Sequence, residues 1–333
     1  MYEKTKKIIQ EKYDVGVFPG VVYCFIDVEQ EDMHVMGNAA LLPEKEQMTS
    51  QHLFDVASLT KVVCTTSVIL KMVENKQLEV DQPLKSYLPA FQDGKITLRH
   101  LLTHTADIVT WIKQRNQLNA KELRQAYLGL QSGEKLGEEV QYTDAGTILL
   151  GFLIEEIFGK SAIEVFQSEV LTPLNMTQSG FPPFGLKKAI VSTEQMPSGE
   201  VLRGLTHDPK ARILGKHGGN AGLFTTIHDL QRFVQSYFHP SPNFLQEATI
   251  HALLKDQTPN GQGKRSLGWD LQGNPMQPFL YHSGYTGTFL LLNPRTKQAF
   301  IFLSNRLHPV DHREAYKKHR GEIIATYLAE IEG

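Results

Sequence analysis

Sequence typical of β-strands lies at the two ends of this chain, and this placement constrains the fold more than any other feature. Gly20 to Val28 is a dense apolar run rich in Val, Phe and Ile, which favours a central strand, and Met33 to Gly37 is its expected hairpin partner. Near the other end, Thr288 to Leu292 and Gln298 to Leu303 are β-rich runs, and the segment between them, Asn293 to Thr296, has the composition of a turn. We therefore expect one antiparallel sheet built from both chain ends.

Helical spacing of apolar residues dominates the remaining sequence. It is clear from Thr60 to Glu74, and Ala145 to Ile157 and Ile227 to Tyr237 give further predicted helices. Residues 4–13 and Arg313 to Ile331 predict a first and a closing helix. The predicted fold class is α+β, with an antiparallel sheet built from both chain ends, flanked by helices, and a large inserted helical region.

The chain reads as a single domain, residues 1–333, without an internal repeat or a low-complexity linker. We expect residues 1–57 and 263–333 to form the sheet part and residues 58–262 to form the mainly helical part. Residues 255–265 are rich in Gly, Asn and charged residues, which predicts an exposed loop.

Composition excludes several classes of function. Apolar residues make up 41% of the chain, so a sizeable core can form. The formal net charge is −2 and the sequence contains no long basic stripe, which argues against a nucleic-acid-binding protein. Short basic clusters at residues 4–7 and 317–320 predict solvated faces of the terminal helices. No apolar run approaches the length of a membrane span, and the N-terminal residues lack the apolar core of a signal peptide, which predicts a cytoplasmic protein.

The two cysteines, Cys24 and Cys64, each lie among apolar neighbours. This setting predicts buried free thiols, since a buried thiol behaves as a small apolar group. We expect neither a disulfide framework nor a catalytic cysteine.

The first motif with chemical potential is Ser58-Leu59-Thr60-Lys61 at the start of a predicted helix. The i, i+3 spacing places the Ser58 hydroxyl and the Lys61 amine on one face, about one turn apart. A neutral lysine there accepts the serine proton, provided that burial or nearby cations lower its pKa. A second copy of the pattern, Ser132 to Lys135, lies in a polar, Gly-containing stretch and shows how readily the motif arises by chance. Taken alone, Ser58 is better explained as a helix cap.

Two further triplets add chemistry of the same kind. Tyr142-Thr143-Asp144 is the only Tyr-x-Asn/Asp triplet in the chain, and a tyrosine in such a place shuttles a proton to a leaving group. His282-Ser283-Gly284 is the only Lys/His-Ser/Thr-Gly triplet, and it directly precedes a predicted strand, where Gly lets a strand edge approach a ligand backbone. Their plain alternatives are a core tyrosine beside a capping Asp144, and an ordinary turn.

The three elements occur in an order and a context that chance agreement does not readily give. The chain resembles the β-lactamase-like serine hydrolases: class C β-lactamases, low-molecular-weight penicillin-binding proteins, D-aminopeptidases and related esterases. The resemblance covers almost the whole chain. Supporting stretches are Phe54 to Lys61, Ile96 to Thr105, Asn220 to Thr226, Leu267 to Trp269 and Gly284 to Thr288.

The resemblance implies a role for each matching residue. Ser58 would be the nucleophile that is acylated, and Lys61 and Tyr142 would share proton transfer. The backbone N–H groups of Ser58 and Tyr285 would form the oxyanion hole. The substrate would contact a group of four further residues, Asp144, His282, Ser283 and Gly284.

Two departures from the family pattern bear on the substrate. Asp144 stands where the family has a neutral amide, and His282 stands where it has a lysine. Both changes are expected to weaken the positive field of the site, because a histidine is largely neutral at pH 7. We therefore expect turnover of small esters or amides by a Ser58 acyl-enzyme, in the manner of an esterase or D-aminopeptidase, with weak β-lactamase activity at most. The alternative is a penicillin-binding or sensor module that acylates without efficient turnover.

Metal catalysis is a competing hypothesis, because the chain has 13 histidines. His100 and His104 have i, i+4 spacing, but Leu101 stands where a zinc hydrolase of this pattern has Glu. His308, His312 and His319 cluster without a well-defined ligand set. We expect no metal and no cofactor, and a small ester, amide or β-lactam as the only partner that the sequence indicates.

Overall fold

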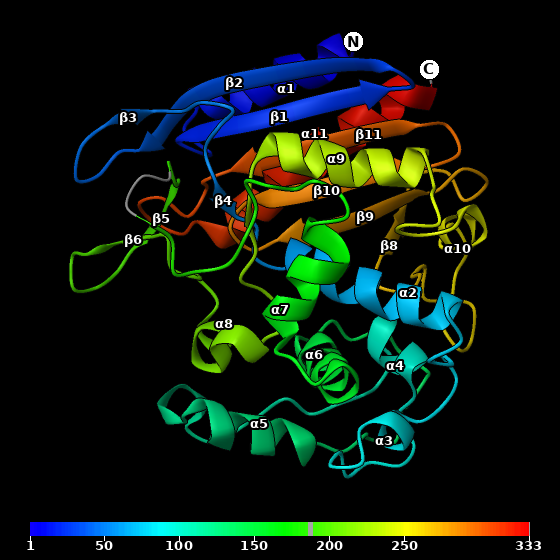
Figure 1. Cartoon of the computed structure of the whole chain (residues 1–333). Coiled ribbons are helices and arrows are strands. Elements are labelled where there is room, and N and C mark those ends of the chain that lie inside the picture. The colour runs from blue at the N-terminus through cyan, green and yellow to red at the C-terminus, as the bar shows by residue number, and fades with distance from the viewer. Residues whose placement is uncertain (186–188, 333) are drawn as a thin grey trace.

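The computed structural model describes residues 1–185 and 189–332, and its centre is a seven-stranded antiparallel sheet of order β3-β2-β1-β11-β10-β9-β8 (Figure 1). The strands are β1 (Gly20–Asp27), β2 (Gln30–Ala40), β3 (Glu46–Gln47), β8 (Asp270–Gln272), β9 (Phe279–Gly284), β10 (Thr288–Asn293) and β11 (Gln298–Ser304). Strand β1 pairs with β11 in antiparallel register, with Cys24 opposite Ile301. The two chain ends thus meet in one sheet, which confirms the predicted fold class.

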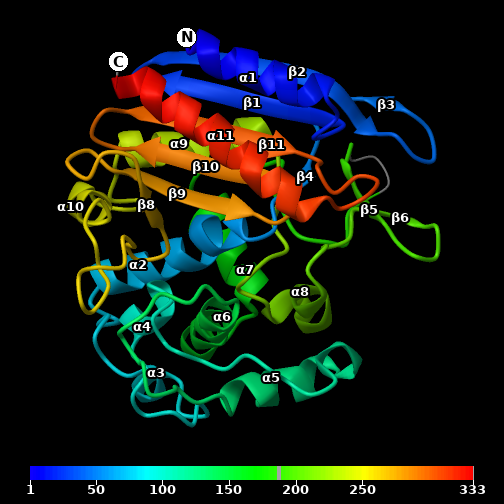
Figure 2. The same cartoon turned by 180° about the vertical axis from the view of Figure 1, so that it is seen from behind.

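The sheet is covered on both faces by helices. Helices α1 (Glu3–Asp14) and α11 (Arg313–Glu332) lie on one face, and α9 (Ile227–Phe238) lies on the other, as the two opposite views show (Figures 1 and 2). Alternate side chains of β1 therefore enter different cores. Phe25 packs with the terminal helices, whereas Cys24 belongs to the core shared with the helical region.

The helical region lies below the sheet. Its first helix begins as a π-helical segment, η1 (Lys61–Thr66), and continues as α2 (Ser67–Glu74), while α6 (Ala145–Phe158) runs buried through the centre. The other helices are α3 (Leu84–Tyr87), α4 (Leu98–Leu102), η2 (Arg115–Gln117), α5 (Ala120–Leu128), α7 (Ala162–Phe166), η3 (Gln167–Leu171), α8 (Pro209–Leu214), η4 (Gly215–His217) and α10 (Glu247–Ala252). Two small sheets join β4 (Phe54–Asp55) to β7 (Phe224–Thr225) and β5 (Ser192–Gln195) to β6 (Val201–Arg203).

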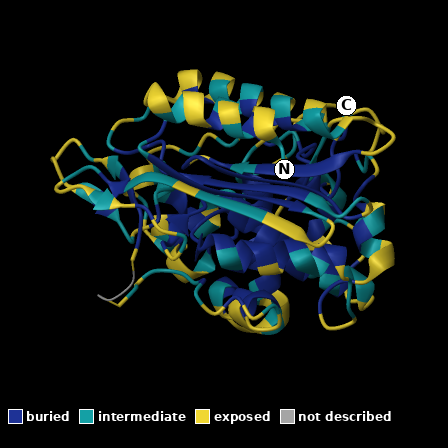
Figure 3. Ribbon diagram, turned by 90° about the horizontal axis from the view of Figure 1, so that it is seen from above, coloured by how far each residue is buried: buried dark blue, intermediate teal, exposed yellow. Residues whose placement is uncertain are grey.

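Most predicted elements are present with shifted ends. Strand β2 is longer than the predicted 33–37, because it lies near the sheet edge and its outer residues are polar and exposed, so they give no apolar signal. Both cysteines are buried and free, as predicted. Figure 3 shows the buried strands enclosed between the terminal helices and the helical region. Among the described residues, no helix is long and apolar enough to cross a membrane.

One predicted loop and one predicted surface were wrong in part. Within residues 255–265, Thr258 is 6% exposed and Arg265 is 4% exposed, so the segment is not an exposed loop throughout. Arg265 is held inside by an ion pair with Asp270 at the start of β8. On α11, Lys317 and Arg320 border a cavity instead of only facing solvent.

Candidate active site

The backbone before Ser58 is held in an unusual conformation. Ala57 has a φ of 45°, which is the left-handed region that non-glycine residues seldom adopt. The buried carboxylate of Asp55 accepts the Ala57 N–H at 2.8 Å and the His207 N–H at 2.7 Å, and so ties this turn to a distant loop. The chain then turns into helix, with Lys61 N donating to Ser58 O at 3.1 Å. Ser58 therefore stands at a helix start, as the sequence predicts.

Lys61 is the centre of a compact polar cluster. It is 1% exposed, and its Nζ lies 2.7 Å from Ser58 Oγ, 3.0 Å from the Asn220 carbonyl oxygen and 2.7 Å from Asp144 Oδ1. These three acceptors match the three N–H donors of an ammonium group. The structure thus brings the first two sequence motifs together at one atom.

A second lysine, which the sequence analysis did not single out, completes the cluster. Lys210, in α8, lies 3.0 Å from Asp144 Oδ2 and 2.6 Å from Asp208 Oδ2. Asp208 also accepts from Asn220 Nδ2 at 3.0 Å. Asp144 is therefore shared by two cations, and its negative charge is not free. The sequence itself carries no clear signal for this role, because Lys210 and Asp144 lie far apart along the chain.

The charges of the cluster determine its protonation. Burial favours a neutral amine, but the Asp144 carboxylate outweighs burial and raises the pKa of Lys61 above its ordinary value. Burial likewise opposes ionisation of Asp144, yet Lys61 and Lys210 hold the pKa of that carboxyl well below its ordinary value. The condition for a neutral Lys61, a lowered pKa, is therefore not met in the free protein. Lys61 is an ammonium ion that donates to Ser58 Oγ.

Tyr142 lies between two buried histidines. Its ring centre is 4.5 Å from that of His104, 6.0 Å from that of His282 and 5.4 Å from Lys61 Nζ. The side chain itself is 50% exposed, so its hydroxyl is open to a substrate. Tyr142 and Ser58 line the same two cavities, which confirms that the two motifs share one site.

The third motif lies on β9, and its residues have different surroundings. His282 is 3% exposed, and burial together with the cations of Lys61 and Arg265 lowers its pKa well below its ordinary value. His282 is thus neutral near pH 7, in line with the expected lack of charge at this position. At Gly284 an added Cβ would lie 2.3 Å from Val56 O, so this glycine lets the strand pack on the backbone just before Ser58. Ser283 lies beside them at the cavity.

Two backbone amides have the properties of an oxyanion hole. Among the described residues, neither Ser58 N–H nor Tyr285 N–H donates to a protein acceptor. Tyr285 is fixed in place, because its carbonyl oxygen accepts from Arg306 Nε at 2.9 Å and its hydroxyl donates to Asp311 at 2.6 Å. Unsatisfied amides beside a nucleophile are suited to an oxyanion that develops during acyl transfer.

Ser58 lies at the junction of two cavities. The larger, of about 500 Å³, extends toward Asp144, His207 and Lys210. The smaller, of about 310 Å³, extends along β9 toward Arg265 and α11. The basic residues that line it are Arg265, Arg306, Arg313, Lys317 and Arg320, and its only lining carboxylate among the described residues is Asp270. The expected weak positive field is therefore wrong. None of these basic residues lies on β9. Three of them, Arg313, Lys317 and Arg320, lie on α11 with the spacing i, i+4, i+7.

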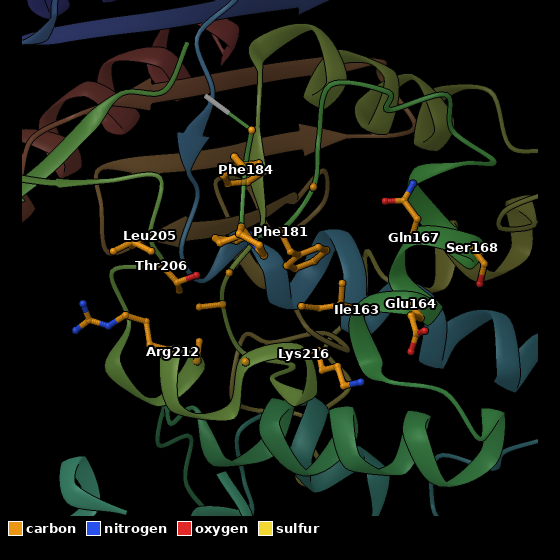
Figure 4. A pocket seen from close by; sticks show the side chains of 18 of the residues that line it. Ile163, Glu164, Gln167, Ser168, Phe181, Phe184, Leu205, Thr206, Arg212 and Lys216 are labelled. Carbon is orange, nitrogen blue, oxygen red and sulfur yellow. The ribbon is translucent and has the colours of Figure 1, made fainter. Parts of the chain in front are cut away.

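A third and larger cavity, of about 1010 Å³, lies beside the cluster but contains neither Ser58 nor Tyr142 among its lining residues (Figure 4). Its wall is formed by Ile163, Phe181, Phe184 and Leu205, with Arg212 and Lys216 at the side. Ala221 lines both this cavity and the 500 Å³ cavity. We do not assign the active site to this larger cavity, because the ion-paired side chains of Lys61, Asp144 and Lys210 lie beside Ser58.

Two other histidines that the sequence offered as metal ligands, His308 and His100, have structural partners. His308 Nε2 accepts from Leu41 N at 2.8 Å, and its Nδ1 lies 2.8 Å from Thr193 O. His100 completes a capping box at the start of α4. Within residues 1–185 and 189–332, no group of three or more His, Cys, Asp or Glu side chains has the arrangement of a metal site.

Comparisons with known proteins agree with this geometry. Residues 5–322 match the family model described as Beta-lactamase. A putative D-alanyl-D-alanine carboxypeptidase of Escherichia coli (strain K12) is 25% identical, over 90% of this chain and 81% of that protein.

Solved structures of low sequence identity share the fold. A class C β-lactamase in complex with cefoxitin has a TM-score of 0.77 at 18% identity, over 98% of both chains. The hydrolase EstCE1, which has promiscuous acyltransferase activity, has a TM-score of 0.77 at 19% identity, over 97% of both chains. The chain therefore belongs to the Beta-lactamase family, as a serine hydrolase of the β-lactamase-related type.

Proposed function

We propose that this protein hydrolyses small esters or amides through an acyl-enzyme formed on Ser58. The observation that carries the proposal is the Lys61 ammonium, which donates to Ser58 Oγ at 2.7 Å and orients it, beside the unoccupied amides of Ser58 and Tyr285. Hydrolysis of both esters and amides begins with attack on a carbonyl carbon, which this arrangement serves.

In the proposed mechanism Tyr142 moves the proton. Ser58 Oγ attacks the carbonyl carbon, and the carbonyl oxygen becomes an oxyanion held by the two amides. The Tyr142 hydroxyl relays the proton: its oxygen accepts the Ser58 proton while its own proton passes to the departing alcohol or amine, as the bond to the leaving group breaks. In deacylation a water molecule attacks the acyl-enzyme, Tyr142 accepts a proton from that water while passing its own to Ser58 Oγ, and the acid is released with Ser58 restored. Lys61 remains a cation throughout, because Asp144 lies 2.7 Å from it.

The names of similar proteins support an ester or amide substrate. The Escherichia coli relative is named for cleavage of a D-alanyl-D-alanine bond, and EstCE1 is described as a hydrolase. The alternative, a module that is acylated once and stalls, has the same nucleophile and differs only in the fate of the acyl-enzyme.

Steady-state turnover separates the two. We expect p-nitrophenyl acetate to be hydrolysed for many turnovers per Ser58, without a burst that ends at one equivalent of p-nitrophenol. Ser58→Ala should abolish turnover, and Ser132→Ala is the matched control, because Ser132 Oγ donates to Asp93 at 2.8 Å in another part of the fold. A single-equivalent burst followed by no further product would favour the sensor module.

A further inference from the structure

Arg265 is buried without satisfying its own hydrogen-bonding groups. It is 4% exposed, and its Nη1 pairs with Asp270, but its Nε and Nη2 have no hydrogen-bond partner. These two nitrogens form one edge of the planar guanidinium group. A buried polar group without a partner is costly, so such an edge is retained where a ligand satisfies it. Nε–H and Nη2–H together match the two oxygens of one carboxylate.

The same cavity contains a second guanidinium group, on a different element. Arg320 makes no hydrogen bond or ion pair with any described residue, and it lines the cavity from α11. On the same face of α11, Lys317 pairs with the exposed carboxylate of Glu314 at 3.0 Å, and Arg313 lies over the Tyr285 ring at 5.2 Å. The single lining carboxylate among the described residues, Asp270, is already engaged by Arg265. Cations therefore outnumber carboxylates around this cavity.

His282 adds to the same indication. Both ring nitrogens are buried without a partner, and the ring lines the cavity beside Tyr142. A neutral imidazole in this position offers one N–H donor. Two independent side chains, both more than nine-tenths buried and both with polar atoms that lack a partner, therefore line one space of about 310 Å³.

We propose that this cavity is a subsite for a substrate group that carries two carboxylates, one bound by the Arg265 edge and the other by Arg320. The inference rests on the proposed function, since the cavity also contains Ser58 and Tyr142. Two separate guanidinium groups with unused N–H donors favour two carboxylates over one. The volume lies at the lower end of the range of small-molecule sites, roughly 300–1,000 Å³, which suits a dicarboxylate the size of an acidic amino acid and not a polymer.

The test uses glutarate as the dicarboxylate and butyrate as a monocarboxylate of similar length. By titration calorimetry at low salt, we expect the parent protein to bind glutarate at least tenfold more tightly than butyrate, and glutarate to inhibit p-nitrophenyl acetate hydrolysis competitively. Arg320→Gln should weaken glutarate binding about tenfold, because a charge-assisted hydrogen bond is lost. Lys318→Gln is the matched control, since this exposed α11 residue does not line the cavity.

Arg265→Gln should weaken glutarate about tenfold or more, and Arg265→Lys should recover only part of the loss, because an ammonium lacks the bidentate edge. Arg320→Gln keeps the proposal testable if Arg265→Gln does not fold. Equal affinity for glutarate and butyrate, an unchanged affinity in Arg320→Gln, or glutarate binding without competition would each overturn the proposal. Calorimetry needs no turnover, so a parent that fails to hydrolyse the ester refutes the proposed function and leaves this subsite separately tested.

Discussion

Replacement of Lys210 by methionine tests whether the cluster around Asp144 works as one electrostatic unit. Lys210→Met keeps a chain of similar length but removes one of the two cations that face Asp144. Removing one partner of a buried ion pair costs about 3–5 kcal/mol. Asp144 retains Lys61 and its side chain is 25% exposed, so we expect a smaller loss of unfolding free energy, about 2 kcal/mol.

The second half of the cycle is Asp144→Asn. Alone it leaves Lys61 and Lys210 without their shared carboxylate, so it should also destabilise the protein. In Lys210→Met/Asp144→Asn the Lys210–Asp144 pair is removed as a whole, so neither residue leaves the other without a partner, and Lys61 faces the neutral amide that the family pattern has at this position. We expect the double variant to be less destabilised than the sum of the singles, with a coupling free energy of about 2 kcal/mol.

Urea unfolding at pH 7 measures all three variants. Lys216→Met is the control, because Lys216 is an exposed lysine near the end of the same segment. Acylation rates with p-nitrophenyl acetate should follow the same pattern, with recovery in the double variant. Additive effects, with a coupling below about 0.5 kcal/mol, would show that Lys210 and Asp144 act independently and would refute the reasoning.

Three further predictions follow from the site. Tyr142→Phe should slow acylation, measured by stopped flow, by about 10²–10⁴-fold. The free energy of unfolding should stay within about 0.5 kcal/mol of the parent value, because the side chain is 50% exposed. A near-normal acylation rate would exclude Tyr142 as the proton carrier. The free energy of unfolding should fall between pH 7 and pH 5, because histidines in the unfolded chain take up protons near pH 6.5, whereas burial keeps the pKa of His282 and of His104 in the folded protein well below that value. The unfolded state therefore binds more protons in this range. His282→Asn should reduce the slope of unfolding free energy against pH by up to about 1.4 kcal/mol per pH unit, and an unchanged slope in urea titrations would contradict this assignment. Ester hydrolysis should survive chelation and dialysis, and a loss that zinc restores would instead implicate the histidines.

The sheet and the main helices could be predicted because their signals are local. The apolar run of β1 and the helical spacing of α6 each reflect one element and its own burial. Pairing between the two ends also followed, because β-rich sequence at both ends of the chain predicts one sheet built from both. The Ser58 and Lys61 pairing followed from helical spacing alone.

The electrostatics of the site could not be predicted in the same way. Arg265 was placed in an exposed loop on composition, because nothing in the segment itself shows that it folds inward onto Asp270. The pairing of Lys210 with Asp144 joins residues far apart in the sequence. Protonation of Lys61 depends on that three-dimensional arrangement, so the spacing of Ser58 and Lys61 could not determine its charge.

Mass spectrometry of the trapped acyl-enzyme tests the central claim most directly. The protein is mixed with p-nitrophenyl acetate, quenched in acid within the first turnovers, digested and mapped for an acetylated residue. The account predicts acetyl on Ser58, unchanged labelling in Ser132→Ala, and no adduct at the site in Ser58→Ala. Acetylation of another residue during turnover, or undiminished hydrolysis by Ser58→Ala, would contradict it.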